Sequence, residues 1–198
     1  MVDPVDLLVG TILSQNTTDA NSLRAFGRLK TAYPDFEALL LAPKSHIEEK
    51  IRQGGLSEIK AHRIKESLAK IKADAGSIDL SFLAGLNMEE ARDYLLSLPG
   101  VGPKTAAVVL LFAFRFATMP VDTHVFRVSR RIGLVPEHAK IMEAQEVLEE
   151  ITPPDKYMSL HINLIRHGRS ICKAQKPLHS DCTLRCICNC YFRATRLK

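Results

Sequence analysis

The segment LPGVGPKTAAVVL, residues 98–110, constrains the fold of this chain more than any other stretch. Gly100 and Gly102 indicate a tight turn, because glycine supplies the positive φ or the close backbone approach that other residues resist. Pro103 is typical of a first helical position, where its missing N–H costs nothing. The segment therefore predicts a helix-hairpin-helix over residues 91–110, whose second helix points free N–H groups at phosphate oxygens.

The phosphate contacts of this hairpin are expected from the turn and from the first helical turn after it. Such contacts recognise the nucleic-acid backbone without regard to base sequence. The candidate residues are Gly100, Val101, Gly102 and Thr105.

Lys104 follows Pro103 and lies in the first turn of the second helix. A lysine there is ordinarily a phosphate clamp or a solvated side chain. The helix dipole disfavours a cation at this end, which lowers the pKa of the ammonium group. Lowering the pKa is how proteins make a lysine into a nucleophile for Schiff-base chemistry. Clamp and nucleophile both remain open from the residues alone.

Asp122, in the segment PVDTHV, is the second candidate. The helix from Pro103 to about Phe114 is roughly 18 Å long, and the six or so residues after it can span about 20 Å. Asp122 can therefore return to the level of Lys104. The alternative is that Asp122 caps the next helix, with its carboxylate bonded to the N–H of residue 124 or 125.

Hydrophobic periodicity indicates helices along the whole chain, and no strand-like alternation of useful length occurs. Ser45 with Glu48, and Asn87 with Glu90, have the spacing of capping boxes. The helix after residue 103 is apolar nearly all round, which predicts a central buried position. A helix over residues 59–72 carries basic residues that we expect on a solvated face: Lys60, Arg63, Lys65, Lys70 and Lys72.

Charge and composition narrow the function classes. No apolar run is long enough to span a membrane and no signal peptide opens the chain, so we expect a cytoplasmic protein, associated with the nucleoid in a prokaryote. The net charge is +5, and residues 166–198 hold eight Lys and Arg against one acid. This distribution favours a nucleic-acid surface, although a solvated basic tail is the commoner meaning of such a run.

The segments LPGVGPKTAAVV and VDTHVFRV resemble the signature of the endonuclease III family of DNA glycosylases. The resemblance extends from Leu7 to Cys188. It implies an all-α, two-lobed helix-hairpin-helix glycosylase fold with a C-terminal iron–sulfur cluster loop. One lobe would be a six-helix bundle over residues 19–132, and the other would combine residues 1–18 with residues 133–198.

The resemblance also implies the activity, base-excision repair by a bifunctional DNA glycosylase and AP lyase. Lys104 would attack C1′ of a damaged nucleotide and form a Schiff base, Asp122 would assist departure of the base, and β-elimination would cleave the strand 3′ to the abasic site. Oxidised pyrimidines are the family's usual substrates. Leu56 would wedge into the duplex where the base is flipped out, and Asn16 would reach the DNA near the lesion.

All five cysteines lie between residues 172 and 190, which points to a metal or an iron–sulfur site in a protein expected to be cytosolic. Adjacent Cys-x-Cys pairs also suit zinc, and no stable site is the third outcome. The segment HGRSIC, residues 167–172, resembles the family's lead-in to a [4Fe–4S] loop of spacing C-x6-C-x2-C-x5-C. Cys172, Cys182 and Cys188 are in register with that spacing, and His179 occupies the second position. The fourth ligand is then His179, or else Cys186 or Cys190.

Two alternative functions remain. A relative of the same fold would remove another base, such as a mismatched thymine or an oxidised guanine. A non-catalytic protein would use the hairpin to bind DNA and the cysteine loop to sense redox state. The expected partner is double-stranded DNA with damaged bases or abasic sites, no membrane is expected to be involved, and the protein is expected to be a monomer.

Overall fold

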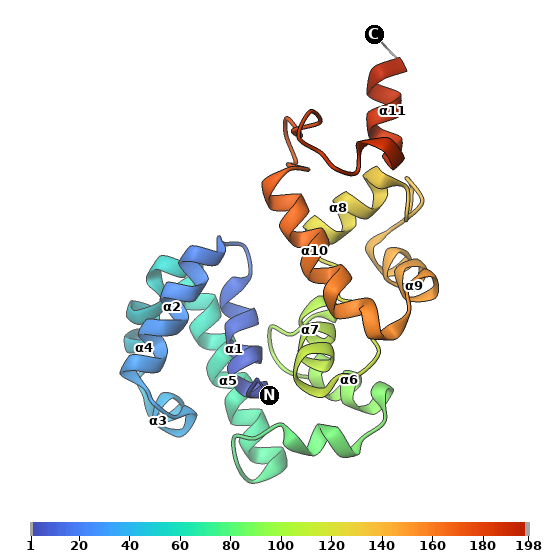
Figure 1. The fold of residues 1–198 in the computed structure, drawn as a ribbon. Coiled ribbons are helices and arrows are strands. Elements are labelled where there is room, and N and C mark those ends of the chain that lie inside the picture. The colour runs from blue at the N-terminus through green and yellow to red at the C-terminus, as the bar shows by residue number, and fades with distance from the viewer. Residues whose placement is uncertain (1, 197–198) are drawn as a thin grey trace. The chain divides into compact units, whose positions relative to one another are not determined.

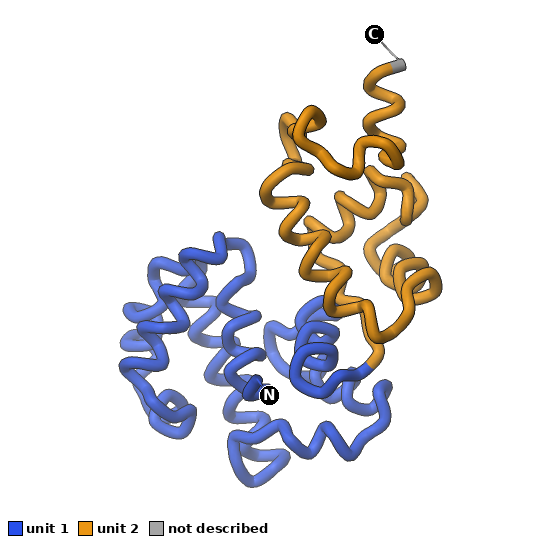
Figure 2. Tube along the Cα trace, viewed as in Figure 1, with its two compact units in different colours: residues 1–116 blue, residues 117–198 orange. Residues whose placement is uncertain are grey.

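The computed structural model describes residues 2–196, and helices are its only regular elements in that range (Figure 1). The prediction of an all-α chain is confirmed. The chain forms two compact units, residues 1–116 and residues 117–198 (Figure 2). None of the helices within residues 2–196 is long and apolar enough to cross a membrane.

The described part of the first unit, residues 2–116, holds seven α-helices and two short 3-10 helices. Their bounds are α1 Pro4–Ser14, α2 Asp19–Ala32, α3 Phe36–Leu41, α4 Lys44–Ile51, η1 Arg52–Gly54, α5 Ser57–Ala75, η2 Ser81–Gly85, α6 Met88–Leu96 and α7 Pro103–Phe114. Helix α1 packs against α2, α5 and α7, while α4 packs against α2 and α5. Helix α1 is therefore an inner element of this unit.

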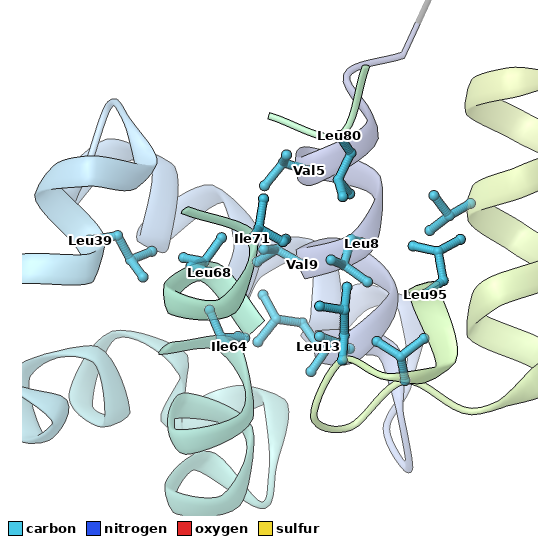
Figure 3. Packing of buried hydrophobic residues seen from close by; sticks show 14 of the residues in the cluster. Val5, Leu8, Val9, Leu13, Leu39, Ile64, Leu68, Ile71, Leu80 and Leu95 are labelled. Atoms are coloured by element: carbon cyan, nitrogen blue, oxygen red, sulfur yellow. The ribbon is translucent and has the colours of Figure 1, made fainter. Parts of the chain in front are cut away.

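The core of the first unit lies between α1 and α5 (Figure 3). Leu8 and Leu13 of α1 and Ile64 and Leu68 of α5 belong to this core, and all four residues are fully buried. Burying a side chain of this size stabilises the fold by about 1.5–3 kcal/mol. Helix α7 adds to the same core and is buried at nearly every position, as its sequence predicts.

Two capping boxes were expected, and one is present. Asn87 accepts from the N–H of Glu90 at 3.0 Å, and the Glu90 carboxylate accepts from the N–H of Asn87 at 3.1 Å, so the box at the start of α6 is confirmed. The box expected at Ser45 is wrong. Helix α4 begins at Lys44, and its N-cap is Pro43, whose fixed φ starts the helix before Ser45 can cap it.

The solvated face expected on α5 is wrong for Lys60. Its side chain is 1% exposed, whereas its neighbour Ile59 is 46% exposed. The buried face of α5 consists of Lys60, Ala61, Ile64, Ser67, Leu68 and Ile71. A lysine therefore occupies a core position, and an isoleucine lies outside.

Between residues 117 and 196, the second unit holds four α-helices and two 3-10 helices. Their bounds are α8 Thr123–Ile132, α9 Ile141–Ile151, η3 Pro154–Lys156, α10 Tyr157–Ser170, η4 Arg185–Ile187 and α11 Asn189–Arg196. Helix α8 packs against α10 and α11. The boundary between the two units differs from that of the expected lobes, because α1 packs within the first unit. The two-lobed arrangement stays a prediction.

Candidate active site and nucleic-acid interface

Residues 97–102 connect α6 to α7 and form the turn that the sequence predicts. The N–H of Val101 donates to the carbonyl of Leu98 at 3.1 Å and closes the turn. Gly100 has a φ of +80°, and a Cβ at this position would lie 2.5 Å from Cδ of Arg63. Position 100 therefore requires glycine for two reasons, its left-handed backbone and the side chain packed against it.

Gly102 differs from Gly100. It is the N-cap of α7 with extended backbone, φ −104° and ψ 179°, and a Cβ there would meet nothing within 4 Å. A positive φ is therefore not the reason for glycine at this position, and close approach of an outside group stays a prediction. Pro103 is the first residue of α7, as expected, and no side chain caps the helix. The N–H groups of the first turn of α7 are therefore suited to an outside acceptor such as a phosphate oxygen.

Two of the expected phosphate contacts have buried side chains. Val101 is 8% exposed and Thr105 is 4% exposed. Val101 also uses its N–H within the turn. Thr105 retains a backbone N–H in the first turn of α7, where the helix supplies no acceptor. The candidate surface for a phosphate is therefore formed by the backbone of Gly102 and of the residues that open α7.

Lys104 is the second residue of α7, and its side chain is partly exposed. The rest of the helix fixes its position, because the residues from Thr105 to Leu111 are all buried. Lys104 thus stands at the positive end of a helix that the core holds rigidly.

Asp122 is the N-cap of α8, as one of its two interpretations predicts. Its Oδ1 accepts from the N–H of His124 at 2.8 Å and from the N–H of Val125 at 2.7 Å. Both bonds use the same oxygen, and Oδ2 takes no part in the cap. The cap therefore uses one of the two carboxylate oxygens and fixes the orientation of the carboxylate.

Side chains of α8 and α10 form further hydrogen bonds near the Asp122 turn. The ring Nδ1 of buried His161 lies 2.8 Å from the carbonyl of Pro120, two residues before Asp122. Arg127 donates from Nη2 to the carbonyl of Gly168 at 2.8 Å and from Nε to the carbonyl of Cys172 at 3.1 Å. These bonds connect the start of α8 to the end of α10 and to the cysteine loop.

His124 belongs to the same network. Its Nδ1 lies 3.0 Å from Nη2 of Arg127. Burial lowers the pKa of His124, the charges of Arg127 and Arg169 lower it further, and Asp122 opposes them. The structure supports an ordering role for His124, since a neutral ring accepts the bond from Arg127 through Nδ1.

Asn16 and Leu56 occupy two turns of the first unit, and both have left-handed backbone, with φ of 52° and 50°. Asn16 is exposed, and Leu56 is 51% exposed although it is apolar. Leu56 is also the N-cap of α5. Strained backbone and an exposed leucine fit residues that are positioned for a contact outside the chain.

Sequence reasoning missed Gln15, the neighbour of Asn16. Its Nε2 donates to the carbonyl of Gly100 at 2.9 Å, and its Oε1 accepts from Nη1 of Arg63 at 3.3 Å. Gln15 therefore connects the Asn16 turn to the hairpin turn. The two turns are 85 residues apart in the chain, and no local pattern predicts such a pairing.

The cysteine loop surrounds a small pocket within the second unit. Arg131 borders it, with Nη1 3.4 Å from Sγ of Cys172, and the Sγ of Cys188 donates to the Arg131 carbonyl at 3.3 Å. Cys186 is exposed and lies outside the pocket lining. The sulfur and imidazole groups that line the pocket are those of Cys172, Cys182, Cys188, Cys190, His167 and His179.

The pocket matches a metal-binding loop in composition. Cysteine thiolates hold iron–sulfur clusters, and imidazole can replace thiolate at iron. Within residues 2–196, no three cysteine, histidine or carboxylate side chains are arranged to hold a metal ion. The residues present fit such a group by their chemistry, and the ligand set stays a prediction.

Residues 9–154 match the family described as the HhH-GPD superfamily base excision DNA repair protein. The match includes the hairpin, Lys104 and Asp122. The chain belongs to the HhH-GPD superfamily.

Relatives and solved structures place this HhH-GPD chain close to endonuclease III. Endonuclease III of Sulfolobus acidocaldarius is 34% identical over 186 residues, which cover 93% of this chain and 81% of the relative. A putative DNA glycosylase of Arabidopsis thaliana is 40% identical over 171 residues, and the match spans 85% of this chain and 58% of that protein. The structure of a trapped endonuclease III–DNA covalent intermediate superposes with a TM-score of 0.84 at 33% identity, covering 99% of this chain and 88% of that one.

The two units of this HhH-GPD protein divide the candidate residues. Asn16, Leu56, Lys104 and the hairpin turn belong to the first unit, and Asp122 and the cysteines belong to the second. The structure connects the Asn16 turn and the hairpin turn through Gln15. The pairing of Lys104 with Asp122 stays a prediction.

Proposed function

We propose that this chain removes oxidised pyrimidines from double-stranded DNA through Lys104 and then cleaves the strand at the resulting abasic site. The enzyme class is DNA glycosylase and AP lyase of base-excision repair, in keeping with family membership and with endonuclease III relatives matched over most of their length. Oxidised pyrimidines are the class that the resemblance to endonuclease III favours, and the preferred lesion is the part that experiment must establish.

The position of Lys104 supports the nucleophile. In the proposed reaction its neutral Nζ attacks C1′, the glycosidic bond breaks, and the base leaves with the bonding electrons. The nitrogen, now bonded to C1′, loses one proton to the departing base, and the C1′–O4′ bond then breaks as O4′ takes up a proton, which leaves the protonated Schiff base. Removal of a proton from C2′ then breaks the C3′–O bond, which is β-elimination. A rigid first turn of α7 serves this chemistry because the attack requires near-contact geometry.

Asp122 is proposed to stabilise the positive charge that develops on the sugar and to assist proton transfer. A carboxylate suits this role when its orientation is fixed before the reaction. The cap bonds to His124 and Val125 supply that orientation through Oδ1. Oδ2 is then the oxygen that faces the reacting nucleotide.

DNA contact is proposed from three turns of the first unit. The backbone of Gly100, Gly102 and the start of α7 binds phosphate, Leu56 fills the space left by the extruded base, and Asn16 contacts the DNA near the lesion. Extruding a base costs a few kcal/mol, and an apolar plug replaces part of the lost stacking.

The cysteine loop is proposed to hold a [4Fe–4S] cluster with Cys172, Cys182, Cys188 and, as the fourth ligand, His179. His179 has the register of the family's spacing and lines the same pocket as the three cysteines. Cys190 lines the pocket too and is the competing ligand, whereas exposed Cys186 does not line it. When bound, the cluster would order the surrounding basic loop.

Borohydride trapping tests the proposed reaction directly. The purified protein is incubated with a duplex that carries thymine glycol, and in parallel with a duplex that carries an abasic site. We expect a covalent complex with the wild type on both duplexes and none with Lys104→Gln. Absence of any complex with a folded wild-type protein on either duplex contradicts the Schiff-base proposal.

A panel of duplexes then fixes the substrate. Trapping on a G·T mismatch or on oxidised guanine, with none on thymine glycol, would replace the proposed lesion by one of the alternatives. Tight DNA binding that survives Lys104→Gln, without turnover on any duplex, would favour a non-catalytic DNA-binding protein. The monomeric state stays a prediction, which analytical sedimentation tests. The cytoplasmic location also stays a prediction, which imaging of the protein in cells tests.

A further inference from the structure

Lys60 is a buried charged residue that the proposed chemistry does not use. Its Nζ donates to the carbonyl of Leu13 at 2.8 Å and to the carbonyl of Gly54 at 2.7 Å, and its side chain is 1% exposed. Burial lowers its pKa. A buried ammonium group is costly unless its protons are satisfied, so these two carbonyl bonds are the reason that the residue is tolerated in the core.

Both carbonyls lie just before turns that the proposed function assigns to DNA contact. Leu13 lies at the end of α1, three residues before Asn16. Gly54 ends η1, two residues before Leu56. Carbonyls at a helix end lack an intrahelical donor, and a lysine is a common partner for them. Lys60 Nζ thus bonds the backbone just before the Asn16 turn and the backbone just before the Leu56 turn.

Two more polar residues on the same face of α5 hold the hairpin turn. Arg63 donates to Gln15, which in turn donates to the carbonyl of Gly100. Ser67 donates from Oγ to the carbonyl of Pro99 at 2.8 Å. Residues 60, 63 and 67 lie on one side of a helix, because their spacing follows the helical repeat.

We infer that Lys60, Arg63 and Ser67, the alignment face of α5, fix the mutual positions of the Asn16, Leu56 and hairpin turns for extrusion of the damaged nucleotide. The inference rests on the proposed function, which assigns these turns to DNA. The three residues are positioning residues. They act through the carbonyls of the turns and through Gln15.

Bonding all three turns to one helix keeps the distances between them fixed. A wedge opens the duplex only if it enters while the hairpin holds the phosphates at a fixed distance from it. A helix held in the core by Ile64 and Leu68 supplies that fixed distance. A misplacement of about 1 Å can cost about 100-fold in rate, so small movements of the turns would be visible in kinetics.

The decisive variant is Lys60→Met, which keeps an unbranched side chain of similar length and removes the donors. The matched control is Lys72→Met on the same helix, because the side chain of exposed Lys72 contacts Glu37 of α3 and none of the turns assigned to DNA. Single-turnover base removal from thymine glycol DNA is compared with trapping on an abasic site, where no base has to be extruded from the stack. Fluorescence of 2-aminopurine beside the lesion follows extrusion itself.

We expect Lys60→Met to slow base removal and the fluorescence change by about 10-fold or more, and trapping at the abasic site by less than about 3-fold. Lys72→Met should match the wild type in all three measurements. Equal slowing on both duplexes would overturn the inference, because it would indicate a general structural role. A folded Lys60→Met protein with wild-type rates would overturn it too.

If Lys60→Met does not fold, Ser67→Ala is the second variant, because it removes only one hydroxyl group. Ser67→Ala should also slow base removal from thymine glycol DNA more than trapping at an abasic site. Hydrogen exchange on the free protein is independent of activity. Lys60→Met should speed exchange in residues 14–18 and 54–57 together and leave α7 unchanged. If the wild type is inactive on every duplex, the proposed function fails, whereas unchanged exchange in both turns refutes the alignment face by itself.

Discussion

Gly100 lies directly against the side chain of Arg63, and a Cβ added to Gly100 would come within 2.5 Å of the Arg63 Cδ and 3.0 Å of its Cβ. The hairpin turn and α5 therefore touch through backbone and aliphatic side chain. Gly102, two residues later, has open space in front of it. The two glycines of this turn therefore have different structural roles, and alanine substitution at each position should have a different effect.

Gly100→Ala should destabilise the protein by about 1–3 kcal/mol, because alanine is strained at φ +80° and Arg63 must move. Gly102→Ala should leave the melting temperature unchanged, because a Cβ there meets nothing within 4 Å. It should weaken binding to an abasic-site duplex, because the added methyl group would stand at the proposed phosphate contact. Thermal melting and fluorescence anisotropy check the pair. Equal loss of stability in both variants would contradict this account.

Asp122→Asn separates capping from catalysis. Asparagine caps helices about as well as aspartate, so the melting temperature should stay near that of the wild type. Removing the charge should slow trapping at an abasic site by about 100-fold or more. Asp122→Ala, in contrast, should also lose about 1 kcal/mol of stability with the cap. An active Asp122→Asn enzyme would show that the residue is only a cap.

Leu56→Ala should slow removal of thymine glycol by about 10-fold, which corresponds to about 1.4 kcal/mol of lost contact in the opened duplex. Stability should not change, since the leucine is 51% exposed. Leu23→Ala on α2 is the control, because Leu23 is 70% exposed and has no assigned role. A Leu56→Ala enzyme as fast as the Leu23→Ala enzyme would remove the wedge from the mechanism.

His124 predicts how stability depends on pH. Burial is the largest cause that lowers its pKa in the folded state, so the unfolded chain binds the proton more readily. Stability is then fully present above the unfolded pKa of about 6.5 and is lost as the pH falls toward the folded pKa. Chemical denaturation between pH 8 and pH 5 measures this loss.

The variant His124→Asn retains an acceptor for Arg127 and does not titrate, so its stability should decline less on acidification than that of the wild type. His46→Asn, at an exposed position of α4, should keep the wild-type slope. A His124→Asn protein with an unchanged slope would mean that other groups carry the pH dependence.

Alanine variants of the cysteine loop test the proposed cluster. The wild type should contain about four irons per chain, and substitution of Cys172, Cys182, Cys188 or His179 should lower the iron content and the visible absorbance. Cys186→Ala, at the exposed cysteine, is the control and should retain both. If Cys190→Ala loses iron and visible absorbance while His179→Ala retains them, the fourth ligand is Cys190.

The sequence alone specified the local features of this protein. Pro103 starts α7, Asn87 and Glu90 form their capping box, and Asp122 caps α8, because each of these depends on residues within one helical turn of one another. The apolar character of residues 103–114 on nearly every side likewise indicated that α7 is buried. The segments LPGVGPKTAAVV and VDTHVFRV, which hold the hairpin turn, Lys104 and Asp122, were enough for the resemblance to the endonuclease III family.

Tertiary structure decided the rest. Lys60 reads as a solvated lysine in the sequence, yet it is buried because two carbonyls from distant turns satisfy its ammonium group. Gln15 and Ser67 give no local signal, since their partners at Gly100 and Pro99 are far away in the chain. A residue's own neighbours determine whether it starts, caps or ends a helix. The free energy of burying a polar group depends on what the folded chain places beside it, and that is decided only when α1, α5 and the hairpin pack together.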